Sequence, residues 1–167
     1  YVDALGAVAF WFRQLWAESL GKKVDRGGKI VYHGLTPVVA MGPADQHSQL
    51  QLYQEGPADK VITFIETSKY RREVALPAAI GRGVKFGDLS RIERLATARS
   101  LASAGRPSGT IMLDALGPEI VGALLMFFML ATSAMGELLD IDVYDQPGVE
   151  ESKLLIKEML SEKQRKS

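Results

Sequence analysis

A glutamine and a glutamate stand four residues apart in a stretch whose apolar residues recur at helical spacing. Gln14 and Glu18 therefore share one stripe of the predicted helix, and Trp11 lies three residues before Gln14 on the same side. A carboxylate beside an aromatic surface is partly desolvated and becomes a stronger base. The pair suits proton transfer, and the alternative that these residues leave open is an ordinary solvated helix face.

A histidine, His47, lies just after a turn at residues 42–45 (GPAD) and in the first turn of a predicted helix. The positive end of the helix dipole disfavours an imidazolium there, so a neutral ring that exchanges protons near neutral pH is expected. The alternative is a histidine that caps or packs locally. His33, in a short Tyr-His-Gly turn, is interpreted as structural.

A third group of polar residues lies at positions 144–153 (YDQPGVEESK). A strand is predicted to end there, the chain turns at Pro147 and Gly148, and a helix begins. Lys153 lies near the N-terminal end of this helix, where a cation is poorly placed for stability. Such a placement is a sign of function, although a lysine on a helix surface is commonplace.

The periodicity of the chain indicates how these residues are positioned. Helices are predicted at 4–20, 46–54, 89–104 (with Asp88 as N-cap), 118–138 and 147–162, and strands at 29–32, 37–41, 60–66, 109–113 and 139–144. This alternation favours a parallel sheet covered by helices on both faces. Ligands of such sheets bind beyond the carboxyl ends of the strands, which directs attention to the turns at 42–47 and 145–150.

Composition removes several classes of function. The chain has 167 residues, which suits one domain, and 20 basic residues balance 20 acidic ones, which disfavours nucleic acid as a partner. There is no cysteine and there are two histidines, which excludes thiolate chemistry and a three-histidine zinc site. The charge-free run at 120–135 is shorter than the roughly 20 residues that span a bilayer. It is interpreted as a helix buried on most sides, inside an α/β layer or at a subunit contact, and no membrane is expected.

The three polar groups together resemble the glucose-6-phosphate isomerase family. Residues 136–139 (GELL), followed after four residues by 144–153 (YDQPGVEESK), fit the C-terminal signature of that family at every constrained position. Residues 18–22 (ESLGK), preceded by Gln14, resemble the segment with the catalytic base, and 46–48 (QHS) resemble the segment with the catalytic histidine. The resemblance extends from about residue 14 to residue 153 and is looser between 67 and 108.

This resemblance implies a cytoplasmic aldose–ketose isomerase of glycolysis and gluconeogenesis that interconverts glucose 6-phosphate and fructose 6-phosphate through a cis-enediol. Glu18 would move a proton between C2 and C1, His47 would assist ring opening, and Lys153 would act at the ring oxygen and favour negative charge on the sugar oxygens. Gln14 and Gln146 would hold the sugar phosphate. No metal or cofactor is implied, and the full-length enzyme would be a homodimer in which the histidine reaches across to the partner.

The resemblance also implies a fold of the sugar-isomerase (SIS) type, a three-layer αβα sandwich with a mainly parallel sheet. Residues 1–167 would form a C-terminal SIS-type domain truncated at its N-terminal side, because the Ser/Thr-rich phosphate loop and the Gly-Gly-Arg segment of the family are not found. We therefore expect the fragment alone to be inactive or nearly so. The alternatives are a non-catalytic SIS-type regulatory module that binds a sugar phosphate, and an interaction protein organised around the apolar helix at 120–135.

Overall fold

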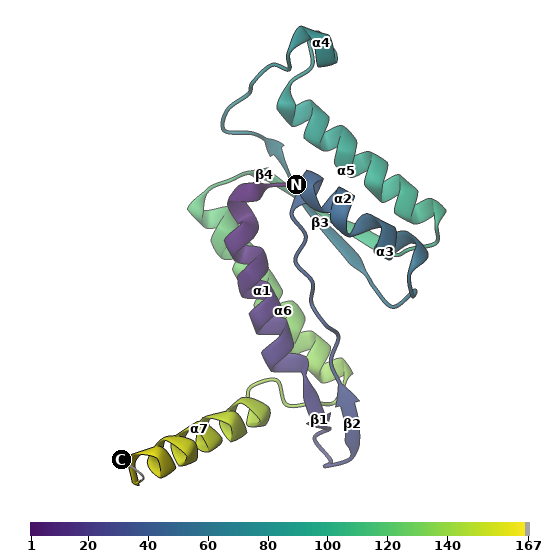
Figure 1. Ribbon diagram of the computed structural model, residues 1–167. Helices are drawn as coiled ribbons and strands as arrows, with labels where there is room; N and C mark the ends of the chain where they lie inside the picture. Colours follow the sequence, from purple (N-terminus) through teal and green to yellow (C-terminus); the bar gives the residue numbers. More distant parts are fainter. Residues whose placement is uncertain (166–167) are drawn as a thin grey trace. The chain divides into compact units, whose positions relative to one another are not determined.

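The computed structural model describes residues 1–165 (Figure 1). Its elements in chain order are a short 3-10 helix η1 (Asp3–Leu5), α1 (Gly6–Leu20), β1 (Lys22–Val24), β2 (Ile30–His33), α2 (Gly42–Ser48), α3 (Leu50–Glu55), β3 (Ile62–Lys69), α4 (Ala78–Gly81), α5 (Phe86–Ser103), β4 (Ser108–Ala115), α6 (Pro118–Leu138) and α7 (Pro147–Arg165). The chain divides into two compact units. The first contains residues 1–10 and 38–126, and the second contains residues 11–37 and those from 127 onward.

The first unit is built on a parallel pair of strands. β3 and β4 run parallel, with Ile62 opposite Ser108 and Lys69 opposite Ala115. Parallel strands need a crossover, and here it contains α5, which contacts α2, α3 and β4 (Figure 1). The side chains of Phe64, Leu101 and Leu113 are buried in this unit, as expected for strands and a helix with one apolar face each.

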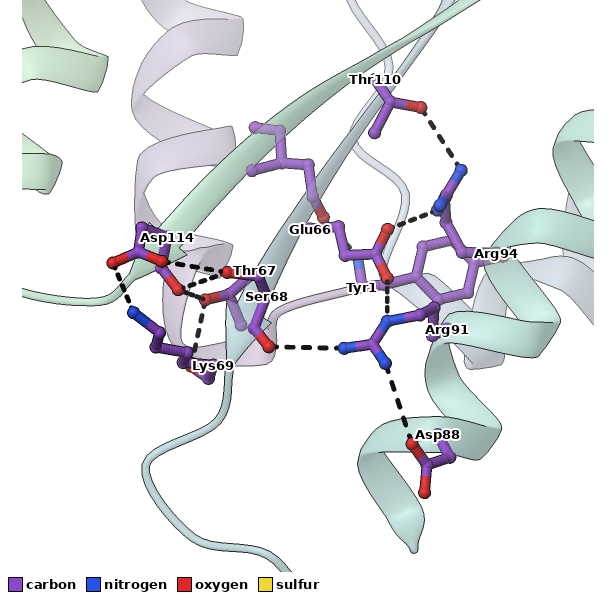
Figure 2. A network of polar contacts seen from close by, with 11 residues as sticks. Tyr1, Glu66, Thr67, Ser68, Lys69, Asp88, Arg91, Arg94, Thr110 and Asp114 are labelled. Atoms are coloured by element: carbon purple, nitrogen blue, oxygen red, sulfur yellow. Dashed lines mark hydrogen bonds and ion pairs between the residues drawn. The ribbon is translucent and has the colours of Figure 1, made fainter. Parts of the chain in front are cut away.

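An ion pair is buried in the same unit (Figure 2). Glu66 on β3 is fully buried, and its Oε2 lies 2.7 Å from Nε of Arg94 on α5. Arg91, one turn earlier on α5, places Nε 3.6 Å from the other carboxylate oxygen. A buried charge is tolerated only with a partner, so this pair fixes the register of α5 against β3.

The second unit has a core of three buried residues, Leu20 at the end of α1 and Ile141 and Val143 after α6. Partly buried residues packed against them are Trp16, Val31, Met135 and Leu139. β1 and β2 form an antiparallel hairpin, and the rings of Phe12 and Phe128 lie 4.4 Å apart between α1 and α6.

The end of α6 turns sharply because of one glycine. The N–H of Ile141 donates to the carbonyl of Gly136 at 3.0 Å, and Asp140 between them adopts φ 53°, a left-handed conformation typical of helix ends. A Cβ at Gly136 would lie 2.1 Å from Cγ1 of Val143. Only glycine therefore lets the segment after α6 fold back this closely.

Several predicted elements differ from the structure. Residues 37–41 and 139–144 form no strand, and the helix expected at 46–54 is two short helices, of which α2 begins earlier, at Gly42. The turn at 42–47 is therefore helix rather than a strand-to-helix turn. Asp88 is not the N-cap of α5 but its third residue, and it accepts the N–H of the true N-cap, Lys85, at 3.2 Å. Residues 37–41 begin with a proline, and residues 139–144 fold back after α6. Neither predicted strand therefore has a neighbouring strand to pair with.

The fold class is confirmed as mixed α/β with a small parallel sheet, while the three-layer SIS arrangement stays a prediction. The apolar helix α6 was expected to be buried on most sides. Within the described residues only 22% of its most apolar window is buried, and α6 is long and apolar enough to span a membrane by length and composition. Burial of this helix inside an α/β layer is therefore not found among the residues that the structure describes, and its burial at a subunit contact stays a prediction.

Candidate active site

The carboxylate–amide pair predicted on one stripe of a helix is present on α1. Nε2 of Gln14 donates to Oε1 of Glu18 at 3.3 Å. Both side chains line an open pocket of about 460 Å³, within the usual size range of small-molecule sites. The other lining residues are Arg13, Ala17, Thr36 and Pro37. The amide holds one carboxylate oxygen and leaves the other available to a ligand.

The aromatic desolvation expected at Glu18 is not found. Glu18 and Gln14 are exposed, and Trp11 is not part of the pocket lining in the described part of the chain. A polar wall formed by Arg13, Gln14 and Glu18 replaces the expected aromatic one. The rest of the lining is formed by small or apolar residues, Ala17, Thr36 and Pro37.

Lys22 ties the helix of Glu18 to a distant segment. Its Nζ lies 3.4 Å from the carbonyl oxygen of Glu18 and 3.1 Å from Oδ1 of Asp145, and it also donates to the carbonyl of Asp145. The turn that precedes Gln146 is thereby held against the last turn of α1. In the sequence Lys22 is the last residue of the 18–22 segment, and nothing there predicted a contact 123 residues away.

Gln146 and Lys153 lie at the start of α7, as predicted. The carbonyl of Gln146 accepts the N–H groups of Val149 and Glu150 at 3.0 and 3.3 Å, and Pro147 occupies the first helical position. Nζ of Lys153 lies 2.7 Å from Oε1 of Glu150, and both side chains are exposed. Neither Gln146 nor Lys153 lines the pocket of Glu18 within residues 1–165. The roles that the resemblance implies for Glu18 and Lys153 on one substrate would need both side chains in one cleft, and that arrangement stays a prediction.

His47 belongs to the first unit, whereas Glu18 belongs to the second. It is exposed in the last turn of α2, not in the first turn of a helix, so the argument from the positive end of a helix dipole is wrong. Asp45 lies two residues before it. The backbone N–H of Met41, followed by the hydroxyl of Ser48 at 2.6 Å, holds the pKa of Asp45 below its usual value.

The remaining polar candidates are His33, possible metal ligands and two further residues of the Glu18 pocket. His33 is partly buried and lines a separate pocket of about 260 Å³ with apolar neighbours such as Trp16 and Met135, and its structural role stays a prediction. Among residues 1–165 there is no group of three or more His, Asp or Glu side chains that could hold a metal ion. Arg13 and Thr36 were missed as pocket residues, since only the fold brings the segment after β2 beside α1.

These features define the class as an α/β protein that presents an amide-oriented carboxylate on the wall of an open pocket. The family model for phosphoglucose isomerase matches residues 1–167, and the chain belongs to that family. It is 43% identical over 161 residues to the glucose-6-phosphate isomerase of Carboxydothermus hydrogenoformans and 47% identical over 161 residues to that of Rubrobacter xylanophilus. Each alignment covers 92% of this chain and 35% of the relative.

Solved structures have a similar fold. A hypothetical protein from Thermus thermophilus superposes with a TM-score of 0.87 at 38% identity, over 96% of this chain and 40% of that one. A glucose-6-phosphate isomerase from Chlamydia trachomatis superposes with a TM-score of 0.81 over 96% of this chain and 33% of that one, and its 24% identity supports the fold alone. The chain thus spans little more than a third of the length of these relatives.

Proposed function

We propose that residues 1–167 form the C-terminal part of a glucose-6-phosphate isomerase, which interconverts glucose 6-phosphate and fructose 6-phosphate. The family membership and the names of the relatives support this proposal. The observation that carries it is the Gln14–Glu18 pair on the wall of the open pocket, because isomerisation between adjacent carbons needs one positioned carboxylate.

In the proposed reaction, Glu18 removes the proton from C2 of the open-chain aldose. The electron pair forms a C1–C2 double bond, the carbonyl oxygen at C1 takes a proton from solvent, and a cis-enediol results. The carboxylic acid of Glu18 then returns its proton to C1, while the hydroxyl at C2 gives its proton back to solvent and becomes the carbonyl. Gln14 orients the carboxylate throughout, and the reaction consumes no cofactor because one proton moves between neighbouring carbons.

The other predicted residues act on the ring and on charge. His47 assists ring opening, Lys153 protonates or stabilises the ring oxygen and the developing oxyanion, and Gln146 binds the sugar phosphate. Because His47 would act from a second subunit, the proposed enzyme is a homodimer. Its substrate class and its relatives make the cytoplasm the proposed location.

The decisive experiment replaces Glu18 in the full natural chain that contains these residues. Glu18→Gln keeps the size of the side chain and removes the base, so kcat should fall by about 10² to 10⁴-fold while binding of fructose 6-phosphate persists. Glu55→Gln, at an exposed residue at the end of α3, is the matched control and should retain full activity. A wild-type chain that binds sugar phosphates without isomerising them would instead establish the regulatory module.

The polypeptide of residues 1–167 alone is a second test. Its pocket is open to solvent, whereas enediolate chemistry needs developing charge to be stabilised in a water-excluded site. We therefore expect the isolated polypeptide to show no turnover above background in a coupled isomerase assay. Turnover close to that of the full natural chain would contradict the expectation that residues outside 1–167 complete the active site.

A further inference from the structure

The side chain of Lys22 is the most deeply buried cation of the second unit among the described residues, with 5% of its surface exposed. Transfer of an ammonium group out of water is costly unless oxygen atoms replace the lost hydration. Lys22 meets this requirement with three oxygens, namely the carbonyl of Glu18 and both the carbonyl and the carboxylate of Asp145. Its position is therefore tightly specified.

The three oxygens belong to two segments that matter for the proposed chemistry. The carbonyl of Glu18 lies in the last turn of α1, where carbonyl groups lack intrahelical partners and attract cations. Asp145 immediately precedes Gln146 and α7. Other ties in this region reach residues before Asp145. Arg26 pairs with Glu137 at the surface, and its backbone N–H donates to the carbonyl of Asp140 at 2.8 Å. Leu20 packs against Ile141 and Val143. Lys22 instead holds Asp145 itself.

We propose that Lys22 is a positioning residue of the isomerase site. It fixes the 145–146 turn against the turn of α1 that carries Glu18, and so sets the distance between the base and the substrate-binding amide of Gln146. Lys22 does not line the pocket of Glu18, so it acts through these two segments rather than on the substrate. This inference rests on the proposed function and adds a residue that the three sequence motifs do not assign to the chemistry.

The test compares Lys22→Met with Lys23→Met in the full natural chain. Methionine preserves the length of the apolar stem and removes the ammonium group, while Lys23 is the exposed neighbour on the same strand. Misplacement of reacting groups by about 1 Å costs up to about 100-fold in rate, so Lys22→Met should lower kcat by about 10 to 100-fold. KM should change by a smaller factor than kcat, because Gln146 is displaced and not removed. Lys23→Met should match the wild type.

Asp145→Asn provides a second and milder variant. Asp145 is 58% exposed, so the protein should tolerate the change, and the ammonium group keeps both carbonyl contacts. We expect kcat to fall by about threefold or more. The combined Lys22→Met/Asp145→Asn variant should fall by less than the product of the two single effects, because both changes break the same contact.

The inference is overturned if folded Lys22→Met, assayed at a temperature well below its unfolding temperature, has the wild-type kcat. A lowered stability of the variant does not change this conclusion. If Lys22→Met does not fold, Asp145→Asn decides, and a wild-type kcat there overturns the inference as well. Glu18→Gln, assayed in parallel, separates the two proposals. If Glu18→Gln is inactive while the Lys22 and Asp145 variants are fully active, the positioning role alone is refuted, and if Glu18→Gln is fully active the proposed function fails first.

Discussion

Addition of one methyl group at Gly136 tests whether this glycine allows the 141–146 segment to fold back on α6. In Gly136→Ala the new Cβ would lie 2.1 Å from Cγ1 of Val143, whereas ordinary contacts begin at 3.4 Å. The difference, 3.4 − 2.1 = 1.3 Å, must be met by movement of Val143, since the new methyl group is fixed to a helix backbone. Val143 is buried beside Leu20 and Ile141, so the segment has little room to move.

The expected magnitude follows from two opposing terms. Overpacking a buried site costs about 1–3 kcal/mol, and the shift required here is large, so the upper part of that range applies. Replacement of glycine by alanine within a helix returns about 1 kcal/mol. We therefore expect Gly136→Ala to lower the free energy of unfolding by about 2 kcal/mol. Gln146 follows Val143 by three residues, so isomerase activity should fall too.

Urea unfolding and an isomerase assay on the full natural chain measure both effects. Val143→Ala alone should cost about 2 kcal/mol through two lost methyl groups and the cavity they leave. In the double variant the methyl group added at position 136 would occupy the space of Cγ1, so the two costs should overlap by at least about 1 kcal/mol. Gly122→Ala is the matched control on the same helix, because a Cβ there meets nothing within 4 Å, and it should stabilise by up to about 1 kcal/mol.

Two results would refute this reasoning. A Gly136→Ala protein as stable as Gly122→Ala would show that the close approach of Val143 and α6 does not exist in solution. Strictly additive effects of Gly136→Ala and Val143→Ala would show that the two residues do not touch.

Two further predictions concern the first unit. Glu66→Leu leaves the buried Arg94 without its carboxylate and should lower the free energy of unfolding by about 3–5 kcal/mol in chemical denaturation. The double variant Glu66→Leu/Arg94→Met should recover most of this loss. If the single and the double variant are equally stable, the unpaired Arg94 is not the cause of the loss. Asp45→Asn tests a pH effect: the pKa of Asp45 is lower in the folded than in the unfolded state, so its contribution is present above the unfolded pKa and is lost as the pH falls through the folded one. The stability gap between wild type and Asp45→Asn should therefore narrow as the pH is lowered from about 5 to 2, and a gap independent of pH would contradict this assignment.

Local signals predicted the long elements well. α6 begins and ends at the predicted residues, 118 and 138, because proline favours the first turn and the apolar periodicity runs unbroken to the end. The strands predicted at 60–66, from its β-branched content, and at 109–113 correspond to β3 and β4, which are longer and form a parallel pair. These features are encoded by residues close together in the chain.

The misses share a different cause. Residues 139–144 have the composition of a strand, yet the left-handed Asp140 and the close approach at Gly136 fold them back on α6 instead. His47 was placed at the wrong end of its helix, because α2 begins four residues earlier than predicted. Lys22 belongs to the 18–22 segment noted in the sequence, but its contact with Asp145 is tertiary and leaves no periodic signal. Sequence spacing identified the candidate base and not the contacts that hold it.

The placement of Lys153 in the proposed site requires a contact that holds α7, and the structure indicates which residues could make it. No residue of α7 is buried within residues 147–165, so core packing does not fix the direction of this helix. The partner of Lys153, Glu150, is about 60% exposed, and surface pairs of this kind contribute little to stability. The ammonium group of Lys153 could thus leave Glu150 and contact a sugar oxygen at little cost in free energy. The larger requirement is a contact that holds α7, and its exposed residues Leu155, Ile156 and Met159 offer the apolar surface for one. Removal of the Glu150 carboxylate should therefore lower isomerase activity far less than a polar residue in place of Ile156. If removal of the carboxylate instead lowers activity more, the ion pair with Glu150, and not a contact of α7, positions Lys153.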